Sequence, residues 1–399
     1  MTHRSISALI LSTTLSLESA PEVSVEHMQV FPEFLKKGEF QGNAGTAFNF
    51  QENKDASDSG LAWAYLQAGY DSSPIYGFSG GIKGLGVAKL WENHPGDFSA
   101  DFVDEAVLQQ LYLDYEDEVH HWGGFVGRRA FSGSPVLDGD YQQGINLSAG
   151  KDSGYQVSFS LINRWIEYAE YDYDADGISG WQDVSDASPD AADIHFALQG
   201  SLPISEVFTV APFLNYQEGL IASYGSSFDT SLPAPMFSED ATWETNLILA
   251  YYDNLISSSI EPDYGSVLSG LIHTGIETEQ YSFGAGIFYV SDNNIDINAG
   301  VFTAFDPLQE DDLYPFNDEN DLLLFYLDGS VTFGDFTLNP AFGFGKNYAL
   351  ESDSLELDLL FTYDLPGGFS LEGFFVAVDF SNHPIPDYNV YGALIDYSF

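Results

Sequence analysis

Five residues between 172 and 183 have the spacing of a calcium-binding loop. Asp172, Asp174 and Asp176 take the first, third and fifth places, Gly177 takes the sixth and Asp183 the twelfth. Carboxylate oxygens at these places and a turn glycine are what a twelve-residue calcium loop requires. A flanking helix pair and a closing bidentate glutamate are missing. The segment is therefore either a structural calcium site or a plain acidic loop tip, and no other cofactor is indicated.

Catalytic chemistry has little support in this sequence. The chain has no cysteine, which excludes a thiol nucleophile and a disulfide framework. Its eight histidines include the neighbours His120 and His121, but no serine nucleophile motif, His-Glu-x-x-His or phosphate loop is present. Adjacent strand residues face opposite ways, so this pair indicates a turn rather than a metal site. We expect that the protein is not an enzyme.

The charge balance excludes nucleic acid as a partner. The chain has 61 acidic and 11 basic residues, a formal net charge of −50. Phosphate binding depends on a basic surface, which this composition cannot supply. The 24 tyrosines, 32 phenylalanines and 38 glycines favour strands and tight turns over helices.

Several segments alternate between apolar and polar residues with a period of two. In residues 355–364 the leucines at odd positions, Phe361 and Tyr363 oppose acidic and hydroxyl residues, with Leu360 as the one exception. Residues 155–165 and 281–289 repeat the pattern. Such segments of about ten residues, each with one apolar and one polar side, are typical of strands that cross a bilayer in a barrel.

The connections between these segments alternate in length. Short ones at 71–74, 118–120, 151–154, 203–205 and 366–368 alternate with long ones at 87–106, 131–142, 167–191, 217–240 and 305–321. Short periplasmic turns and long outer loops are typical of bacterial barrels. We predict an all-β fold, a transmembrane antiparallel barrel of about 18 strands; an ambiguous stretch at 253–280 leaves 16 as the alternative.

The two ends of the chain fit this organisation. An apolar run in residues 6–17 predicts a signal peptide over 1–20, followed by a periplasmic segment over 21–38 and the barrel over 39–399. The last strand alternates and ends in Tyr397 and Phe399. It resembles the closing strand by which the barrel assembly machinery recognises such proteins. We expect location in the cell outer membrane, in contact with its lipids.

Residues 108–150 resemble the OprD-like family of outer-membrane porins. Family members have an aromatic-rich strand, a hairpin into Gly-Arg-Gln, and a loop with Ser/Thr-Pro-Leu and aspartates. Here Arg129 replaces the glutamine, and Val136 separates the proline from the leucine. The matching residues are Tyr112, Tyr115, Gly127, Arg128, Ser134, Pro135, Leu137, Asp138 and Asp140. The resemblance implies an 18-stranded barrel whose third outer loop, about residues 131–142, bends into the lumen and narrows it.

Arginines are the most informative candidates in the lumen because cations are scarce. Strand parity turns Arg164 and one of Arg128 and Arg129 inward, and the family motif favours Arg128. These arginines either hold the carboxylate or hydroxyl groups of a passing solute or neutralise acids of the wall. The predicted pore constriction comprises Arg128, Arg129, Arg164, Ser134, Pro135, Asp138 and Asp140.

Acidic residues are expected to give the lumen a negative potential. Parity turns inward Asp114, Glu116, Asp328, Asp335, Glu356, Asp358 and Asp396. A low-dielectric wall around such charges concentrates cations. We therefore predict a cation preference, unless most of the negative charge lies in the outer loops.

These observations predict a porin that passes small hydrophilic solutes by passive diffusion. The first alternative is a channel selective for carboxylates, amino acids, peptides or oligosaccharides. An outer-membrane hydrolase or an adhesive barrel belongs to other classes, and about 18 strands disfavour the plugged adhesive type because they leave an aqueous channel. Both a monomer and a trimer are compatible with the sequence.

Overall fold

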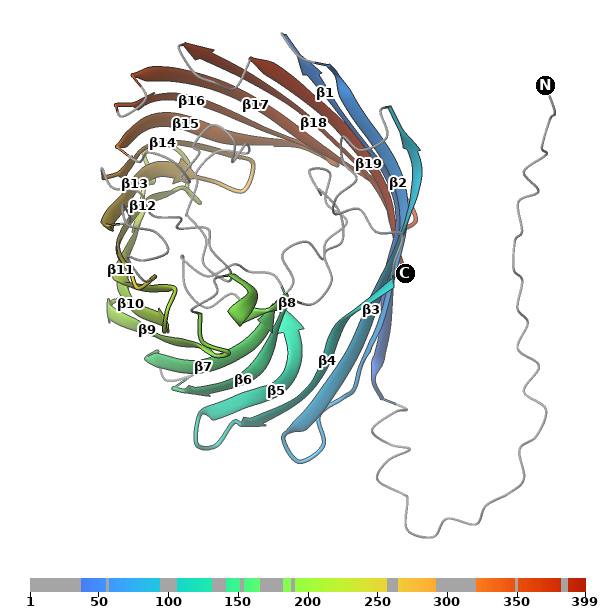
Figure 1. Cartoon of the computed structure of the whole chain (residues 1–399), viewed down its shortest axis with the longest axis vertical. Helices are drawn as coiled ribbons and strands as arrows, with labels where there is room; N and C mark the ends of the chain where they lie inside the picture. Colours follow the sequence, from blue (N-terminus) through green and yellow to red (C-terminus); the bar gives the residue numbers. More distant parts are fainter. Residues whose placement is uncertain are drawn as a thin grey trace, which may run out of the picture.

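The computed structural model describes residues 37–54, 57–93, 106–130, 141–150, 154–165, 182–187, 191–256, 265–291, 321–348, 351–381 and 387–399. Nearly all of them lie in strands that form a ring (Figure 1). Among these residues no helix is long and apolar enough to cross a membrane. The predicted signal peptide and most of the predicted periplasmic segment lie outside the described residues.

The strands have the following bounds, in chain order. They are β1 (Glu39–Asn53), β2 (Ser59–Asp71), β3 (Phe78–Glu92), β4 (Ala106–Asp117), β5 (Trp122–Ala130), β6 (Tyr141–Ala149), β7 (Gln156–Trp165), β8 (Gln182–Asp183), β9 (His195–Ser205), β10 (Phe208–Gln217), β11 (Ile221–Pro233), β12 (Thr242–Asn254), β13 (Ser266–Glu277), β14 (Tyr281–Val290), β15 (Leu322–Phe333), β16 (Phe336–Asn347), β17 (Ser352–Leu365), β18 (Phe369–Ser381) and β19 (Tyr388–Ser398). A 3-10 turn, η1 (Val184–Ala187), follows β8.

The sheet closes on itself. Strand β1 pairs with β2 on one side and with β19 on the other, and all pairings are antiparallel. Strand β7 pairs with β9 along most of its length, and the two-residue β8 pairs only with its last two residues. The wall therefore has 18 strands, as predicted. Closure satisfies the backbone groups of every strand, which a lipid environment demands.

The connections at the two ends of the ring differ in length. At one end the links are short turns such as 118–121, 206–207 and 334–335, whereas the other end has long ones such as 166–194 and 291–321. The prediction of a long connection over 217–240 was wrong. Those residues comprise the last residue of β10, a three-residue turn, strand β11 and part of the next link. Strand β11 is rich in serine, so its period of two is weak in the sequence.

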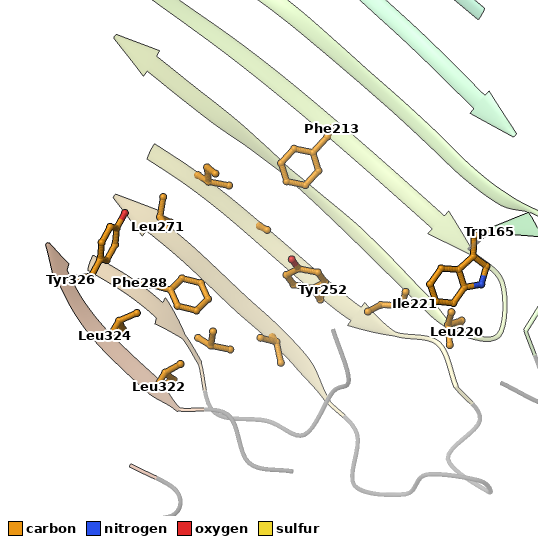
Figure 2. Packing of buried hydrophobic residues seen from close by; sticks show 14 of the residues in the cluster. Trp165, Phe213, Leu220, Ile221, Tyr252, Leu271, Phe288, Leu322, Leu324 and Tyr326 are labelled. Carbon is orange, nitrogen blue, oxygen red and sulfur yellow. The ribbon is translucent and has the colours of Figure 1, made fainter. Parts of the chain in front are cut away.

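The two sides of the wall have different chemistry. On one side, exposed apolar residues recur at alternate positions, including Leu66, Leu111, Val126 and Phe325, with 48–55% of the surface of each exposed. This is the outer side, as expected for contact with acyl chains. On the lumenal side, the part near the long connections carries buried apolar residues such as Tyr252, Phe288 and Leu324 (Figure 2). Towards the short turns the lumenal side is polar.

Candidate functional site

A hydrogen-bonded set of polar side chains lines β1–β4 on the lumenal side. Gln41 donates from Nε2 to Asp71 Oδ2 at 2.7 Å, and the Tyr112 hydroxyl donates to Asp71 Oδ1 at 2.8 Å. The last contact crosses the whole of β3. It passes over Gly81, where a Cβ would lie 2.2 Å from Asp71 Oδ1. A glycine is therefore required at position 81 for β2 and β4 to form this side-chain hydrogen bond across β3.

Arg129 is the arginine that joins this lumenal set. Its Nη1 donates to Asp114 Oδ2 at 2.8 Å, and its guanidinium lies 4.7 Å from the ring centroid of Tyr112 and 5.6 Å from that of Phe125. The opposing position to Tyr112 is Gly127, which leaves room for the arginine to lie back across the strand. The Arg129 side chain stays 38% exposed, so it remains open to a solute.

Arg128 and Arg164 lie on the other side of the wall. The register pairs Arg128 with Leu111 and with Gln143, and Gln143 with Arg164. Leu111 is 52% exposed on the outer side, so the residues paired in this row, Arg128, Gln143 and Arg164, also lie on the outer side. The sequence had predicted a lumenal position for Arg128 and Arg164. Arg128 Nε donates to Gln143 Oε1 and Arg164 Nε to Asp183 Oδ1, both at 2.7 Å.

A β-bulge explains the position of Arg164. Between Gln143 and Gly144 the register with β7 shifts, so that Gly144 faces Ile162 while Gln143 faces Arg164. The extra residue in β7 is Asn163, and a bulge of this kind reverses the alternation beyond it. Trp165 therefore joins the buried lumenal cluster, and Arg164 takes the outer side.

A second polar patch lies on β11–β15. His273 Nε2 and Asp328 Oδ1 are 2.9 Å apart, and the imidazole stacks on the Tyr326 ring with centroids 5.7 Å apart. His273 and Asp328 help to line a cavity of about 410 Å³ together with Asp229 and Glu244. The cavity opens on the polar part of the lumen, because the exposed apolar residues of these strands lie on the opposite side.

Acids dominate this patch because the sequence offers almost no cations nearby. From residue 165 to residue 399 the chain has one lysine or arginine, Lys346, whose Nζ lies 3.5 Å from Asp353 Oδ1. Asn246 donates to Asp229 at 2.5 Å, and Ser231 donates to Glu244 at 3.3 Å. The carboxylates of Asp229 and Glu244 thus accept hydrogen bonds from uncharged side chains.

The other predicted lumen acids have different settings. Glu356 and Asp358 are on β17 with 0% and 1% of their surface exposed, so they are buried in the wall. Asp396 accepts hydrogen bonds from the Tyr65 hydroxyl and from Ser398 at 3.2 Å. Asp114 faces Arg129, and Glu116 lies two residues further along the same side of β4. Asp335 lies in the β15–β16 turn, at the rim instead of in the lumen.

Part of the predicted site lies outside the described residues. This holds for the constriction residues Ser134, Pro135, Asp138 and Asp140 and for the loop residues Asp172, Asp174 and Asp176. The fourth calcium candidate, Asp183, pairs with Arg164. Within the described ranges, no group of three or more histidine, aspartate or glutamate side chains could hold a metal ion.

The closing strand pairs with the first strand along its whole length, and its terminal residue extends this pairing. The Phe399 N–H donates to the Gly42 carbonyl at 2.9 Å, and the Gly42 N–H donates to the Phe399 carbonyl at 3.0 Å. The Phe399 ring lies 6.3 Å from that of Phe40, and Tyr397 stacks 6.0 Å away. The two residues of the predicted assembly signal thus lie at one end of the seam, the pairing of β1 with β19 that closes the barrel.

Comparison with solved structures agrees with this geometry, whereas no family model and no curated protein sequence matches the chain. OccK3 (OpdO) of Pseudomonas aeruginosa aligns with a TM-score of 0.72 and 12% identity, over 92% of this chain and 97% of that one. OccAB1 of Acinetobacter baumannii aligns with a TM-score of 0.70 and 12% identity, over the same shares. OpdQ of Pseudomonas aeruginosa gives 0.68 and 11%, over 91% and 99%. The chain therefore has the barrel fold of the OprD/Occ porins, as the resemblance of residues 108–150 predicts.

Proposed function

We propose that the protein is an outer-membrane porin through which small hydrophilic solutes diffuse passively, with a preference for cations. The observation that carries the proposal is the closed 18-stranded wall with an apolar outer side and a lumenal side that is polar and acidic towards the short turns. A wall of this size leaves an aqueous bore, and acidic side chains within it attract cations. The fold shared with OprD/Occ porins supports the same function.

Reconstitution in planar bilayers tests this proposal directly. Purified protein should insert and give stepwise conductance, and a KCl gradient should give a reversal potential of the sign expected for cation preference. An anion-selective reversal potential would contradict the charge preference alone. A folded protein that gives no conductance steps would contradict the porin function itself.

A selective channel is the second candidate, and one observation favours it. The Arg129–Asp114 pair and the cavity beside His273 and Asp328 place charges of both signs on the lumenal side. Such charges could hold a carboxylate, amino acid, peptide or oligosaccharide in a fixed orientation. Current block by one of these classes at low concentration would favour selectivity, and equal indifference to all four would favour the general porin.

The remaining expectations belong to the same proposal. Transport by diffusion needs no catalysis and no cofactor, and lipase and protease assays on the folded barrel test the first point. Calorimetry with millimolar calcium tests the loop at 172–183. Assembly by the barrel assembly machinery depends on the seam at Phe399, and crosslinking in membranes distinguishes a monomer from a trimer.

A further inference from the structure

Two arginines lie side by side on the lipid-facing side of the wall. They belong to a row of residues that face one another across β4 to β8, which we call the arginine row and which consists of Leu111, Arg128, Gln143, Arg164 and Asp183. Strands β4 to β7 are neighbours in the wall (Figure 1). The whole chain has 11 basic residues, so this row holds a large share of them. Cations on a lipid-facing side are costly unless an anion accompanies them.

The arginine row lies where the apolar band of the outer side ends. The next row towards the short turns is wholly apolar and consists of Leu113, Val126, Ile145 and Leu161. In the other direction, only two residues of β5 follow Arg128 and one residue of β7 follows Arg164 before the long connections begin. Long connections of a bacterial barrel face the outside of the cell. The row therefore lies at the boundary between the acyl chains and the headgroups of the outer leaflet.

Hydrogen bonds hold the two arginine side chains on either side of Gln143. Arg128 Nε donates to Gln143 Oε1 and Arg164 Nε donates to Asp183 Oδ1, both at 2.7 Å. Gln143 Nε2 donates in turn to Asn163 Oδ1 at 3.3 Å. A guanidinium has several N–H donors, and each of the arginine bonds takes one.

The two guanidinium groups can act on the same ligand. Gln143 alone separates the two arginines in the row, so their backbones are about 10 Å apart. Their positive charges are close enough to repel each other. An anion bound between them would replace this repulsion by attraction to both.

Charge and position together identify the class of ligand. Two guanidiniums and one carboxylate leave the arginine row with a net positive charge, although the chain as a whole has a formal charge of −50. Phosphate oxygens accept paired hydrogen bonds from arginine, and a phosphate group carries the charge that the row requires. The apolar row beside it would contact acyl chains attached to that phosphate. A phosphorylated lipid combines both parts.

We propose that the arginine row binds the phosphate group of a glycolipid of the outer leaflet, with Arg128 and Arg164 as its donors. The acyl chains of this lipid lie on the apolar row formed by Leu113, Val126 and Ile145. The proposal goes beyond the porin function, because it concerns the outer side of the wall and does not depend on conduction.

Lipid binding to the folded barrel in detergent micelles is the first test. The probe is diphosphoryl lipid A, and native mass spectrometry counts the lipid molecules that stay bound. We expect a single lipid on the wild type and roughly tenfold weaker binding to Arg128→Gln with Arg164→Gln, because glutamine remains polar but has no charge. Arg129→Gln is the matched control, since it removes the same charge from the neighbouring residue on the lumenal side. This control should bind the lipid like the wild type.

Two further probes separate the phosphate from the rest of the lipid. Lipid A without its phosphates should bind the wild type no better than diphosphoryl lipid A binds the double variant. Inorganic phosphate at millimolar concentration should not displace the bound lipid, because it has no acyl chains to contact the apolar row. Equal binding of the dephosphorylated lipid, or displacement by inorganic phosphate, would overturn the proposal.

Thermal unfolding in liposomes gives a second readout. The wild type should unfold several degrees higher in phosphatidylcholine liposomes that contain lipid A than in those without it, because a ligand of the folded state stabilises that state. The double glutamine variant should unfold at the same temperature in both. Arg128→Lys with Arg164→Lys keeps both charges and should retain part of the shift, which distinguishes loss of binding from misfolding.

A second copy of the chain is the alternative occupant of the arginine row. In that case the double glutamine variant would change the oligomeric state measured by analytical ultracentrifugation and would bind lipid A like the wild type. This result would overturn the lipid assignment. A wild type that binds lipid A as expected but does not conduct would instead contradict the porin function alone.

Discussion

His273 on β13 contacts Asp328 on β15 across the whole width of the strand between them. The Nε2 and Oδ1 atoms are 2.9 Å apart, although β14 separates their strands. The contact passes over Gly284, where a Cβ would lie 2.1 Å from the imidazole nitrogen and 2.7 Å from the carboxylate oxygen. Tyr326 lies in the same way over Gly286. The absence of a side chain at Gly284 is therefore the condition for a hydrogen bond between two strands that are not neighbours.

Adding a side chain at Gly284 should break this pair. We expect Gly284→Ala to destabilise the folded barrel by about 1–3 kcal/mol, because side chains forced into occupied space must shift from their rotamers. Chemical denaturation in detergent micelles measures the change. Gly86→Ala is the control, since its Cβ would have only the Ala106 Cβ at 4.0 Å as a neighbour. Equal stability of the two variants would contradict the required role of Gly284.

Arg129 and Arg128 should differ in their effect on ion selectivity. Arg129→Gln removes a lumenal cation and leaves Asp114 without this partner, so the potassium-to-chloride permeability ratio should rise by roughly a factor of two. Arg128→Gln removes an arginine of the outer row and should leave the ratio unchanged. Reversal potentials in KCl gradients give both values. The opposite ranking would mean that the side assigned to these arginines is incorrect.

The acids of the second patch should contribute to cation preference. Asp229→Asn combined with Glu244→Gln removes two lumenal charges without changing side-chain size, and should lower the permeability ratio by roughly a factor of two to three. The control is Glu351→Gln, in the turn between β16 and β17. A reversal potential that is the same in all three proteins would locate the selectivity elsewhere.

A pH-dependent contact is expected between two connections at the rim. The Lys54 ammonium donates to the Asp387 carboxylate, which also accepts the Phe380 N–H at 2.9 Å, and these donors lower the pKa of Asp387. A lowered pKa in the folded state means that the contact stabilises the barrel at pH values above the ordinary aspartate range. The stabilisation is lost as pH falls through the lowered pKa.

Thermal unfolding as a function of pH tests this contact. Asp387→Asn should lower the unfolding temperature at neutral pH, and the difference from the wild type should shrink as the solution is acidified. Lys54→Ala should give the same profile, because it removes the other partner. A difference that stays constant down to strongly acidic pH would show that the charge of Asp387 is not involved.

The terminal residue should matter for assembly more than other aromatics at the same rim. Phe399→Ala removes the ring that contacts Phe40 and Tyr397, so we expect several-fold less folded barrel in outer-membrane fractions. Phe333→Ala, at the end of β15, removes a ring that is 70% exposed and should assemble normally. The heat-modifiable band on gels measures the folded fraction. Equal yields would contradict a special role for the seam.

Strands could be predicted from the sequence where contact with lipid requires large apolar residues at alternate positions. Strands β14 and β17 present large apolar residues at alternate positions, so their period of two is obvious. Strand β11 has serine or glycine at many positions on both sides, so its sequence lacks a clear period of two and predicts a loop. The bulge at Asn163 reverses the sides on which Arg164 and Trp165 lie. No residue near it indicates this change in the sequence.

The contacts of the candidate site were less accessible than the fold. Alternation identifies which residues share a side of a strand, but it says nothing about contacts across two strands. The His273–Asp328 pair joins residues 55 positions apart, and the Asp71–Tyr112 bond joins residues 41 positions apart. The only available signal for the first was the glycine pair in β14, whose lumenal positions leave the space.

The glycine-crossing contacts also bear on how the wall would come apart under force. Asp71 with Tyr112, and His273 with Asp328, each tie a strand to the second strand along, as well as to its backbone partners. A cantilever pulling the chain from one end would then have to break two kinds of attachment before β13 or β2 peels away. We therefore expect β2 and β13 to be pulled out together with neighbouring strands, in steps of a hairpin or more, and seldom as single strands.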